Sequence, residues 1–423
     1  MKNITTTTKT ILFASLIAAM ILPFSGMMMA EAAQSDDKQR VTQKQISIEK
    51  NFERFLKLQE QSDTIQVKIN SLEEQHDKNN DPELKKLEKQ MLVVQKQLEQ
   101  VQKQSNKLHE IPQVKIDKLL EAMDKIKENF SFRSDEHPDA PLDAMFVDTA
   151  KELIVVLENP ESTEFSNSAN TVATRSAGIS AMTPEIKSFV GDEIEIIVTS
   201  MRDQSHNSSS NCNYDHERDD YCQPAAGGVE ISSGNERDPT DPVVSTLGFP
   251  ATQNDGTKGF VTVGHALYDR ELEPIGSPVY QPDSLNQIGT VKDRYYNGHQ
   301  DCDCAFIELT NGRTVANQVV YGAGILLTID DFKDKWQTSD GDIIMMSGKT
   351  LGSQFGAINS RYNYNTETVF ATYNAIPGDS GGPVGKVSGS VIDIYGIHKG
   401  NSWYGNYEAY MPYDVLDSYL DLQ

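Results

Sequence analysis

The chain has 423 residues, a formal net charge of −24 and only four cysteines. This length exceeds what one ordinary domain needs, so we expect two or three domains. The acidic charge argues against a nucleic-acid partner, because a phosphate backbone attracts clustered Lys and Arg and is repelled by an acidic surface.

The N-terminus has the pattern of a cleaved export signal. Lys2 and Lys9 precede an apolar run at 11–22, and small residues at 30–33 offer a signal peptidase a place to cut. A membrane anchor is the alternative, but the run is short for a bilayer span. We therefore predict a signal peptide at 1–33 and a secreted or extracytoplasmic protein.

Residues 34–130 are rich in Gln, Glu and Lys with regularly spaced apolar residues. This spacing alternates steps of three and four, which predicts a coiled-coil seam. A polar break at 76–82 would let two helices fold back on each other. We interpret the region as a spacer or as a surface for self-association. The seam residues are Leu84, Leu87, Met91, Val94, Leu98 and Val101, and an earlier run contains Phe52, Phe55, Ile65, Ile69 and Leu72.

Residues 131–224 predict a linker followed by a small α+β unit. A strand is expected at 146–157, and Glu193 to Ile196 alternate as a second strand. Between them, Thr183 as cap, Pro184 in the first turn and Gly191 at the end bracket a short helix.

From residue 225 to 423 the sequence changes to short apolar runs separated by Gly, Asn, Asp and Pro. The runs at 259–263 and 388–394 are examples. Many short strands with frequent turns predict an all-β sandwich or a pair of barrels.

The most informative segment is Pro377-Gly378-Asp379-Ser380-Gly381-Gly382-Pro383. A serine hydroxyl is a weak nucleophile and needs a base, together with donors for the oxyanion that forms on attack. The glycines allow a sharp turn that aims amide groups at one point. We predict Ser380 as nucleophile and the amides of Gly378 and Ser380 as oxyanion donors.

The base and its orienting carboxylate should lie upstream at strand ends. His265 follows an apolar strand and enters a small-residue corner, which would leave its imidazole facing a cleft. Asp303 comes just before the apolar run at 304–307, so its charge would lie at a buried strand and hold the imidazole tautomer. Asp301 is the competing candidate, and we prefer Asp303.

The order His265, Asp303, Ser380 resembles the chymotrypsin clan, and it is most similar to the streptogrisin and α-lytic protease group. The segments at 245–249, 375–380 and 411–416 also resemble that group, over about the last two hundred residues. The resemblance implies a chymotrypsin-like double β-barrel at 225–423 that hydrolyses protein or peptide substrates and needs no metal or organic cofactor. It also implies a long prosegment upstream, although a coiled coil that stays attached to the active protease is an open alternative.

The resemblance places the specificity pocket between 375–378 and 396–400, so Ala375, His398 and Gly400 become candidate substrate-binding residues. Gly396-Ile397-His398 is similar to the same segment of bacterial glutamyl endopeptidases. A protonated or hydrogen-bonding imidazole there would favour Glu or Asp before the scissile bond. Ala375 departs from that pattern, since one such group has a hydroxyl residue at this place.

Other positions depart from the group as well. Ala266 replaces a cysteine that usually follows the histidine, and Lys399 replaces a serine that often contacts the triad carboxylate. The cysteines are Cys212, Cys222, Cys302 and Cys304, which in an exported chain suggest two disulfides with three pairings open. Cys302 and Cys304, two apart, would be slightly too far apart for an easy bridge on an extended strand, and a zinc site is the less favoured reading.

The predicted function is therefore a secreted serine endopeptidase made as a zymogen. Two alternatives stay open from the sequence. One is a catalytically silent adhesion module on a coiled-coil stalk, and the other is an esterase, because the same residues cleave esters.

Overall fold

A computed structural model describes most of the chain from Asp36 onward. The predicted signal peptide, Cys212, Cys222 and Asp301 lie outside the described residues. The chain divides after Gln43 into two compact units, and all contacts given below lie within 44–423. The described residues are 36–75, 82–132, 137, 140–158, 183–191, 194–202, 218, 224–233, 243–267, 275–282, 286–296, 302–310, 312–321, 325–360, 363–364, 367–402 and 407–423.

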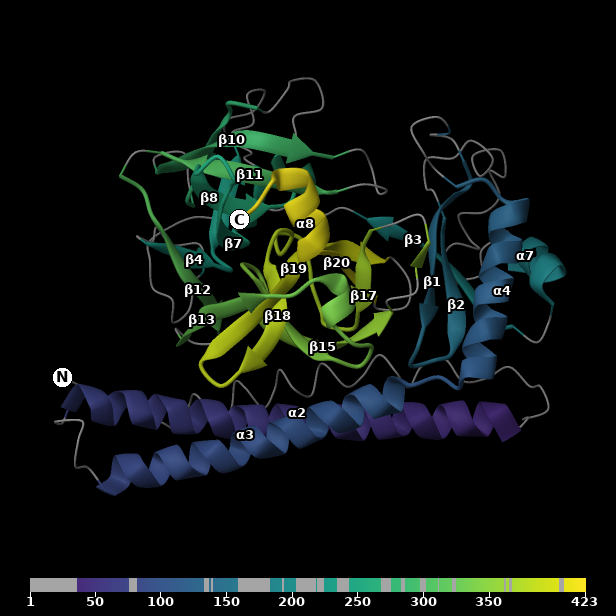
Figure 1. Ribbon diagram of the computed structural model, residues 1–423, viewed down its shortest axis with the longest axis horizontal. Coiled ribbons are helices and arrows are strands. Elements are labelled where there is room, and N and C mark those ends of the chain that lie inside the picture. The colour runs from purple at the N-terminus through teal and green to yellow at the C-terminus, as the bar shows by residue number, and fades with distance from the viewer. Residues whose placement is uncertain are drawn as a thin grey trace. The chain divides into compact units, whose positions relative to one another are not determined.

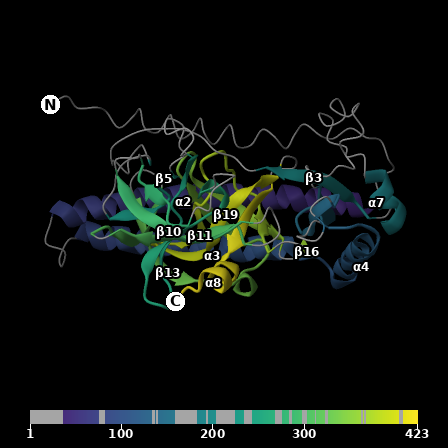
Figure 2. The same ribbon diagram turned by 90° about the horizontal axis from the view of Figure 1, so that it is seen from above.

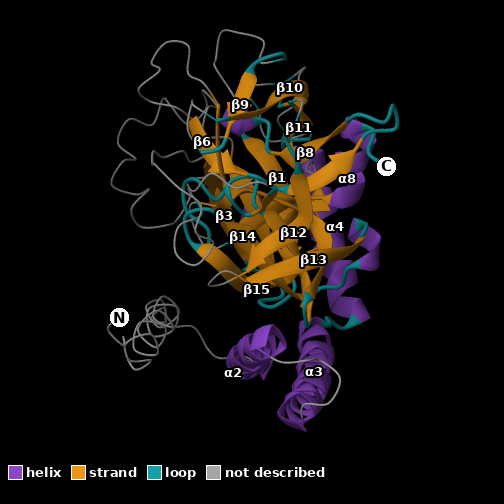
Figure 3. Cartoon of the chain, turned by 90° about the vertical axis from the view of Figure 1, so that its left-hand side faces the viewer, coloured by secondary structure: helices purple, strands orange, loops and turns teal. Residues whose placement is uncertain are grey.

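Two long helices, α2 (Asp36–Gln75) and α3 (Pro82–His109), lie side by side (Figure 3). Ile69 of α2 packs with Leu84 and Leu87 of α3, and Phe55 packs with Val94 farther along. The predicted seam is therefore buried, as the three-four spacing requires. Ile343, from the C-terminal β-rich part of the chain, belongs to the same cluster, so the seam packs on a strand as well as on the other helix. That the two helices form a coiled coil stays a prediction. No helix among the described residues is long and apolar enough to span a bilayer.

The α+β unit follows, and it differs from prediction at its first strand. A single strand at 146–157 is wrong, because the segment is a hairpin. Asp148 Oδ1 accepts the backbone N–H groups of Ala150 and Lys151, each at 2.9 Å, and Glu152 has a φ of 57°. These contacts make the turn between β1 (Leu142–Asp148) and β2 (Leu153–Glu158).

The rest of the unit packs on this hairpin. The predicted helix is confirmed as α7 (Thr183–Val190), which ends where Gly191 adopts a φ of 90°. β3 (Ile196–Arg202) runs parallel to β2, and α4 (Gln113–Asn129) and α7 lie together beside these strands (Figures 1 and 2). Leu119, Ile126, Val156, Ile186 and Val198 are part of their shared core.

The predicted all-β domain begins with a sheet in the order β6-β5-β9-β10-β11-β8-β7. Its end strands are consecutive in the chain, joined by Leu247 and Gly248, whose amides donate to Val229 and Val261 on either side. The sheet therefore curves back on itself. The strands are β5 (Glu230–Ser233), β6 (Val243–Thr246), β7 (Phe249–Thr252), β8 (Lys258–Thr262), β9 (Pro278–Tyr280), β10 (Gln287–Tyr295) and β11 (Cys304–Leu309), with a 3-10 helix η1 (His265–Leu267) after β8.

The second half forms a closed antiparallel ring in which β14, β15, β17, β20, β19 and β18 pair in turn. The double-barrel architecture is thus confirmed at this level. The ring strands are β14 (Ile343–Gly348), β15 (Gly352–Ser360), β17 (Val369–Ala371), β18 (Pro383–Ser388), β19 (Val391–Ser402) and β20 (Glu408–Pro412). Around them lie β4 (Ala225–Gly227), β12 (Val315–Tyr321), β13 (Ile325–Phe332), η2 (Lys335–Gln337), β16 (Asn363–Tyr364) and α8 (Tyr413–Leu420).

Two features join the parts of this fold. One apolar cluster contains Phe249 and Val261 from the first sheet together with Ile394 and Met411 from the second, so the two halves share a core. In addition, the upstream unit pairs with the second half through main-chain hydrogen bonds, β1 with β16 and β3 with the end of β19. The upstream strands and the ring therefore belong to one sheet.

Candidate active site

The turn that carries Ser380 is built from glycines that no other residue could replace. Gly378 and Gly381 have φ values of 96° and 90°, in the left-handed region that favours glycine. A Cβ on Gly381 would also lie 2.3 Å from the carbonyl oxygen of Thr246. This crowding fixes the backbone on both sides of Ser380, which is 4% exposed.

Asp379 stabilises this turn through hydrogen bonds to its carboxylate. Its carboxylate accepts the backbone N–H groups of Thr350 at 2.7 Å, Ile376 at 3.0 Å and Leu351 at 3.1 Å. Burial raises the pKa of Asp379, while these N–H groups and the nearby Arg218 act in the opposite direction. The residue before Ser380 is thus tied to the β14–β15 turn.

The amides of Gly378 and Ser380 donate no hydrogen bond to any group in the described part of the chain. Asp379, between them, donates its own N–H to Ile376 instead. Two unengaged amides, one of the serine itself and one two residues before it, are what an oxyanion requires.

The structure brings two of the three predicted triad residues, His265 and Asp303, together, while no hydrogen bond joins His265 to Ser380 in the described part of the chain. His265 opens η1 directly after β8, and Asp303 precedes β11, the neighbouring strand. The imidazole Nδ1 lies 2.7 Å from Asp303 Oδ2, and the backbone N–H of His265 donates to Oδ1 at 2.9 Å. Both carboxylate oxygens therefore hold the histidine, one through its ring and one through its main chain.

Asp303 is fully buried. Burial alone would raise its pKa, but His265 and Lys399 together hold the pKa of this carboxyl below its usual value. Asp303 is therefore ionised over the ordinary pH range and able to stabilise an imidazolium.

The cysteines on either side of Asp303 correct the prediction. Cys302 and Cys304 form a disulfide, with their Cα atoms 5.4 Å apart. The expectation of too long a separation assumed a fully extended strand, but β11 begins only at Cys304, and the residues before it are not extended into the sheet. The bridge encloses Asp303, whose carboxylate contacts His265.

Ser380 is hydrogen-bonded to strand β19. Its Oγ donates to the carbonyl oxygen of Lys399 at 3.4 Å. The two segments are also joined by the N–H of Gly381 donating to His398 and the N–H of His398 donating to Gly382. The Lys399 side chain is 1% exposed and acts electrostatically on Asp303. Lys399 thus contacts Ser380 through its carbonyl oxygen and acts on Asp303 through its charge.

His398 does not face solvent. It is 3% exposed, and its Nδ1 lies 3.0 Å from the hydroxyl of Tyr373. Burial, together with the nearby His265, lowers the pKa of His398 to about 3. The imidazole is therefore neutral near pH 7. Of the two forms considered from the sequence, protonated or hydrogen-bonding, this excludes the protonated one.

The other predicted pocket residues lie beside His398. Gly400 pairs with Ala409 across β19 and β20, and the N–H of Ala375 donates to the carboxyl group of Glu408. Glu408 is 5% exposed, and burial raises its pKa well above the usual value. Sequence reasoning missed Tyr373 and Glu408, because neither belongs to a local motif.

In the described part of the chain, no group of three or more His, Cys, Asp or Glu is arranged to hold a metal ion. No protein-family model and no curated protein matches the sequence.

Solved structures match about half of the chain. The crystal structure of Nocardiopsis protease is 24% identical, with a TM-score of 0.37, over 48% of this chain and 98% of that chain. Cellulomonas bogoriensis chymotrypsin is 21% identical, with a TM-score of 0.35, over 47% and 97%. A glutamic acid specific serine protease, described as using a histidine triad in substrate binding, is 21% identical, with a TM-score of 0.37, over 47% and 98%. The predicted resemblance is thus found again among solved structures.

Proposed function

We propose that the chain is a serine endopeptidase with a triad of Ser380, His265 and Asp303. The observation that supports this most is the double hold of Asp303 on His265, through Nδ1 at 2.7 Å and through the backbone N–H at 2.9 Å. A carboxylate that fixes both the ring and its main chain sets the tautomer that a general base needs.

The chemistry follows from these groups. Ser380 Oγ attacks the carbonyl carbon of the scissile peptide, and His265 Nε2 takes its proton. The oxyanion is held by the N–H groups of Gly378 and Ser380. His265 then gives the proton to the leaving amine, and a water molecule repeats the sequence to release the acyl group from Ser380.

Hydrolysis of casein by the secreted protein tests the proposal. Ser380→Ala should abolish turnover, because triad loss lowers kcat by many powers of ten. Ser388→Ala is the matched control, since Ser388 is an exposed serine at the end of β18. Equal activity of Ser380→Ala and wild type would reject the peptidase; hydrolysis of esters without peptides would favour the esterase.

We further propose that Ala375, His398 and Gly400 contact the side chain before the scissile bond, with a preference for Glu or Asp. His398 is neutral, so any contact it makes with a carboxylate would be a hydrogen bond and not an ion pair. Glu408 would repel an acidic side chain if it were ionised, but its raised pKa favours the neutral form.

A peptide panel that varies only this residue among Glu, Gln, Lys and Leu measures the preference. The highest kcat/KM for Glu would support recognition through His398. A preference for Lys would instead assign the dominant role to Glu408, and a preference for Leu would exclude both.

We also propose that the chain is exported and made as a zymogen whose upstream part is later removed. The buried contacts between the two parts support a prosegment that docks specifically on the C-terminal part of the chain. Gln102 of α3 donates to the carbonyl of Gly341 at 3.0 Å, and the N–H of Ile343 donates back to its Oε1 at 2.9 Å. Tyr407 donates to the Asp148 carboxylate, and Lys151 donates to Tyr407 at 2.8 Å.

Intact-mass measurement of the secreted, active protein tests both parts of this proposal. Export with processing predicts loss of the first 33 residues and then of the helices. A full-length active species would contradict removal. The molar mass of the Ser380→Ala protein in solution, measured by light scattering, tests self-association through α2 and α3.

A further inference from the structure

Arg218 is the one residue that the structure describes between 203 and 223, and its side chain enters the catalytic domain. It is 8% exposed. Its own carbonyl accepts the N–H of Glu230 at 2.7 Å, so the main chain at this point is paired beside β5. No local pattern in the sequence indicates this insertion, and the predicted boundary at residue 225 leaves Arg218 outside the protease domain.

The guanidinium is bonded to three strands of the domain, β12, β14 and β15, and to the turn at Gly228. Nη1 donates to Ser347 Oγ at 2.5 Å, to the carbonyl of Gly348 at 3.0 Å and to that of Gly228 at 3.3 Å. Nη2 donates to Ser353 Oγ at 3.0 Å and to the carbonyl of Val320 at 3.2 Å. Five acceptors surround the four N–H groups of Nη1 and Nη2, so at least one N–H is shared between two acceptors, and the site is shaped for the planar fork of an arginine.

Glycines leave the room that this side chain fills. A Cβ on Gly228, where φ is 92°, would lie 2.8 Å from Arg218 Nη1 and 2.4 Å from Ser347 Oγ. Burial lowers the pKa of Arg218 to about 10, which leaves the group charged near pH 7. The charge that opposes this effect belongs to Asp379.

The site connects Arg218 to the nucleophile. Its acceptors Gly348 and Ser353 flank the β14–β15 turn, and that turn supplies the N–H groups of Thr350 and Leu351 to the Asp379 carboxylate. Gly348 touches Asp379 directly, because a Cβ there would lie 2.2 Å from Asp379 Oδ1. Asp379 in turn stands between the two oxyanion amides.

We propose that Arg218 is a positioning residue of the catalytic domain, which sets the oxyanion turn through Asp379, and that the active enzyme therefore retains it. The cut that removes the upstream part lies N-terminal to Arg218, and the catalytic chain begins before residue 225. This inference rests on the proposed peptidase activity. It adds that the shortest fully active enzyme must still contain Arg218.

Kinetics of variants that are expressed as the full chain and measured in the secreted, active form test the positioning role. Arg218→Gln should lower kcat at least about tenfold with KM within about twofold, because a displaced oxyanion amide costs rate and not substrate binding. Arg218→Lys keeps the charge and should recover part of the loss. Arg313→Gln, which removes an arginine whose Nε donates to Gln287 in the first sheet, is the matched control. Active sites are counted by titration with a fluorescent phosphonate.

The outcomes separate a positioning role from a structural one. If Arg218→Gln only reduces the number of titratable sites and each remaining site has the wild-type kcat, the proposal is overturned. N-terminal sequencing of the active secreted form gives a second readout. A start at or before Arg218 supports the proposal, and a fully active form that starts after it contradicts the proposal.

A third measurement does not depend on activity. Full-length Ser380→Ala protein is treated briefly with trypsin, which cuts after accessible Arg and Lys. Protection of the Arg218–Asp219 bond supports the buried anchor, and rapid cleavage there overturns it. If the wild type hydrolyses no peptide while this bond is protected, the peptidase proposal fails and the anchor stands.

Discussion

The side chain of Asp303 holds His265 twice, with one carboxylate oxygen 2.7 Å from the ring Nδ1 and the other accepting the backbone N–H at 2.9 Å. Both carboxylate oxygens accept a hydrogen bond, whereas an asparagine has only one acceptor oxygen and its amide nitrogen is a donor. An asparagine could therefore keep only one of the two bonds. Asp303→Asn should therefore lower kcat by about 10⁴-fold with the fold intact. Casein hydrolysis and circular dichroism measure this, and a loss under tenfold would assign the orienting role to another carboxylate, with Asp301→Asn as the comparison.

The low pKa of His398 makes a prediction about pH. A group whose pKa lies at about 3 stays neutral from pH 5 to 8. The ratio of kcat/KM for Glu and Gln peptides should then change by less than about twofold over this range, once the ionisation of the Glu side chain of the substrate has been corrected for. A preference for Glu that falls as pH rises through 6 to 7 would mean that the imidazole is charged when substrate binds.

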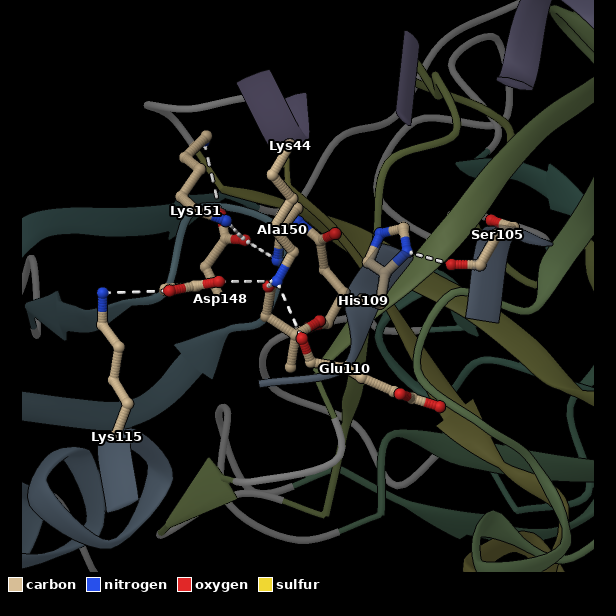
Figure 4. Close-up of polar contacts among 11 residues, drawn as sticks. Lys44, Ser105, His109, Glu110, Lys115, Asp148, Ala150 and Lys151 are labelled. Carbon is tan, nitrogen blue, oxygen red and sulfur yellow. Dashed lines mark hydrogen bonds and ion pairs between the residues drawn. The ribbon is translucent and has the colours of Figure 1, made fainter. Parts of the chain in front are cut away.

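Glu152 should be the most sensitive charged residue of the upstream unit. Its carboxylate is buried and pairs with Lys44 at 2.8 Å and Lys115 at 2.9 Å. Figure 4 shows these lysines around the turn at Asp148 and Ala150. Glu152→Gln should lower the free energy of unfolding by about 3 kcal/mol, because it leaves two ammonium groups without their carboxylate.

Urea unfolding of the full chain, with Ser380→Ala to prevent self-cleavage, measures the effect of Glu152→Gln. Glu121→Gln is the matched control. Its carboxylate pairs with Lys125 at 3.0 Å but both side chains are largely exposed, so the change should stay below about 0.5 kcal/mol. Equal effects of the two variants would contradict a buried ion pair at Glu152.

Asp63 predicts a pH-dependent contribution to stability. It accepts a hydrogen bond from Tyr321 at 2.6 Å, and burial raises its pKa from 3.8 to about 6. Because the folded pKa is the higher one, its stabilising contribution is complete below about pH 4 and is lost as pH rises through 6.

Asp63→Asn should remove this loss. The variant should gain about 2 kcal/mol relative to wild type between pH 4 and pH 8, after allowance for partial solvent exposure. Urea midpoints of Ser380→Ala proteins at both pH values measure the difference. A constant difference across this range would show that the carboxyl titrates normally.

The sequence predicted those features that are encoded locally. The glycine turn at Ser380 and the strand-end positions of His265 and Asp303 are short patterns with a direct chemical meaning. The helix from Thr183 to Gly191 was predicted for the same reason, since its cap and stop signals lie within nine residues.

What the sequence did not predict depends on distant partners or on small departures from ideal geometry. The sequence predicts one strand at 146–157 and not a hairpin, because the turn is made by Asp148 binding backbone groups and not by Gly or Pro. The prediction that Cys302 and Cys304 lie slightly too far apart for an easy bridge assumes a fully extended backbone, which the structure does not have there. The insertion of Arg218 joins residues more than one hundred positions apart, which no local pattern reports.

The sheet shared by the upstream unit and the C-terminal ring affects how the two pieces of the proposed zymogen would separate after cleavage. β1 pairs with β16 and β3 with β19, so a single break in the covalent chain between them leaves both pieces attached through their backbones. Cutting and dissociation are then separate events. We expect a nicked intermediate that runs as one species on a sizing column and as two in denaturant, until the upstream piece is itself degraded.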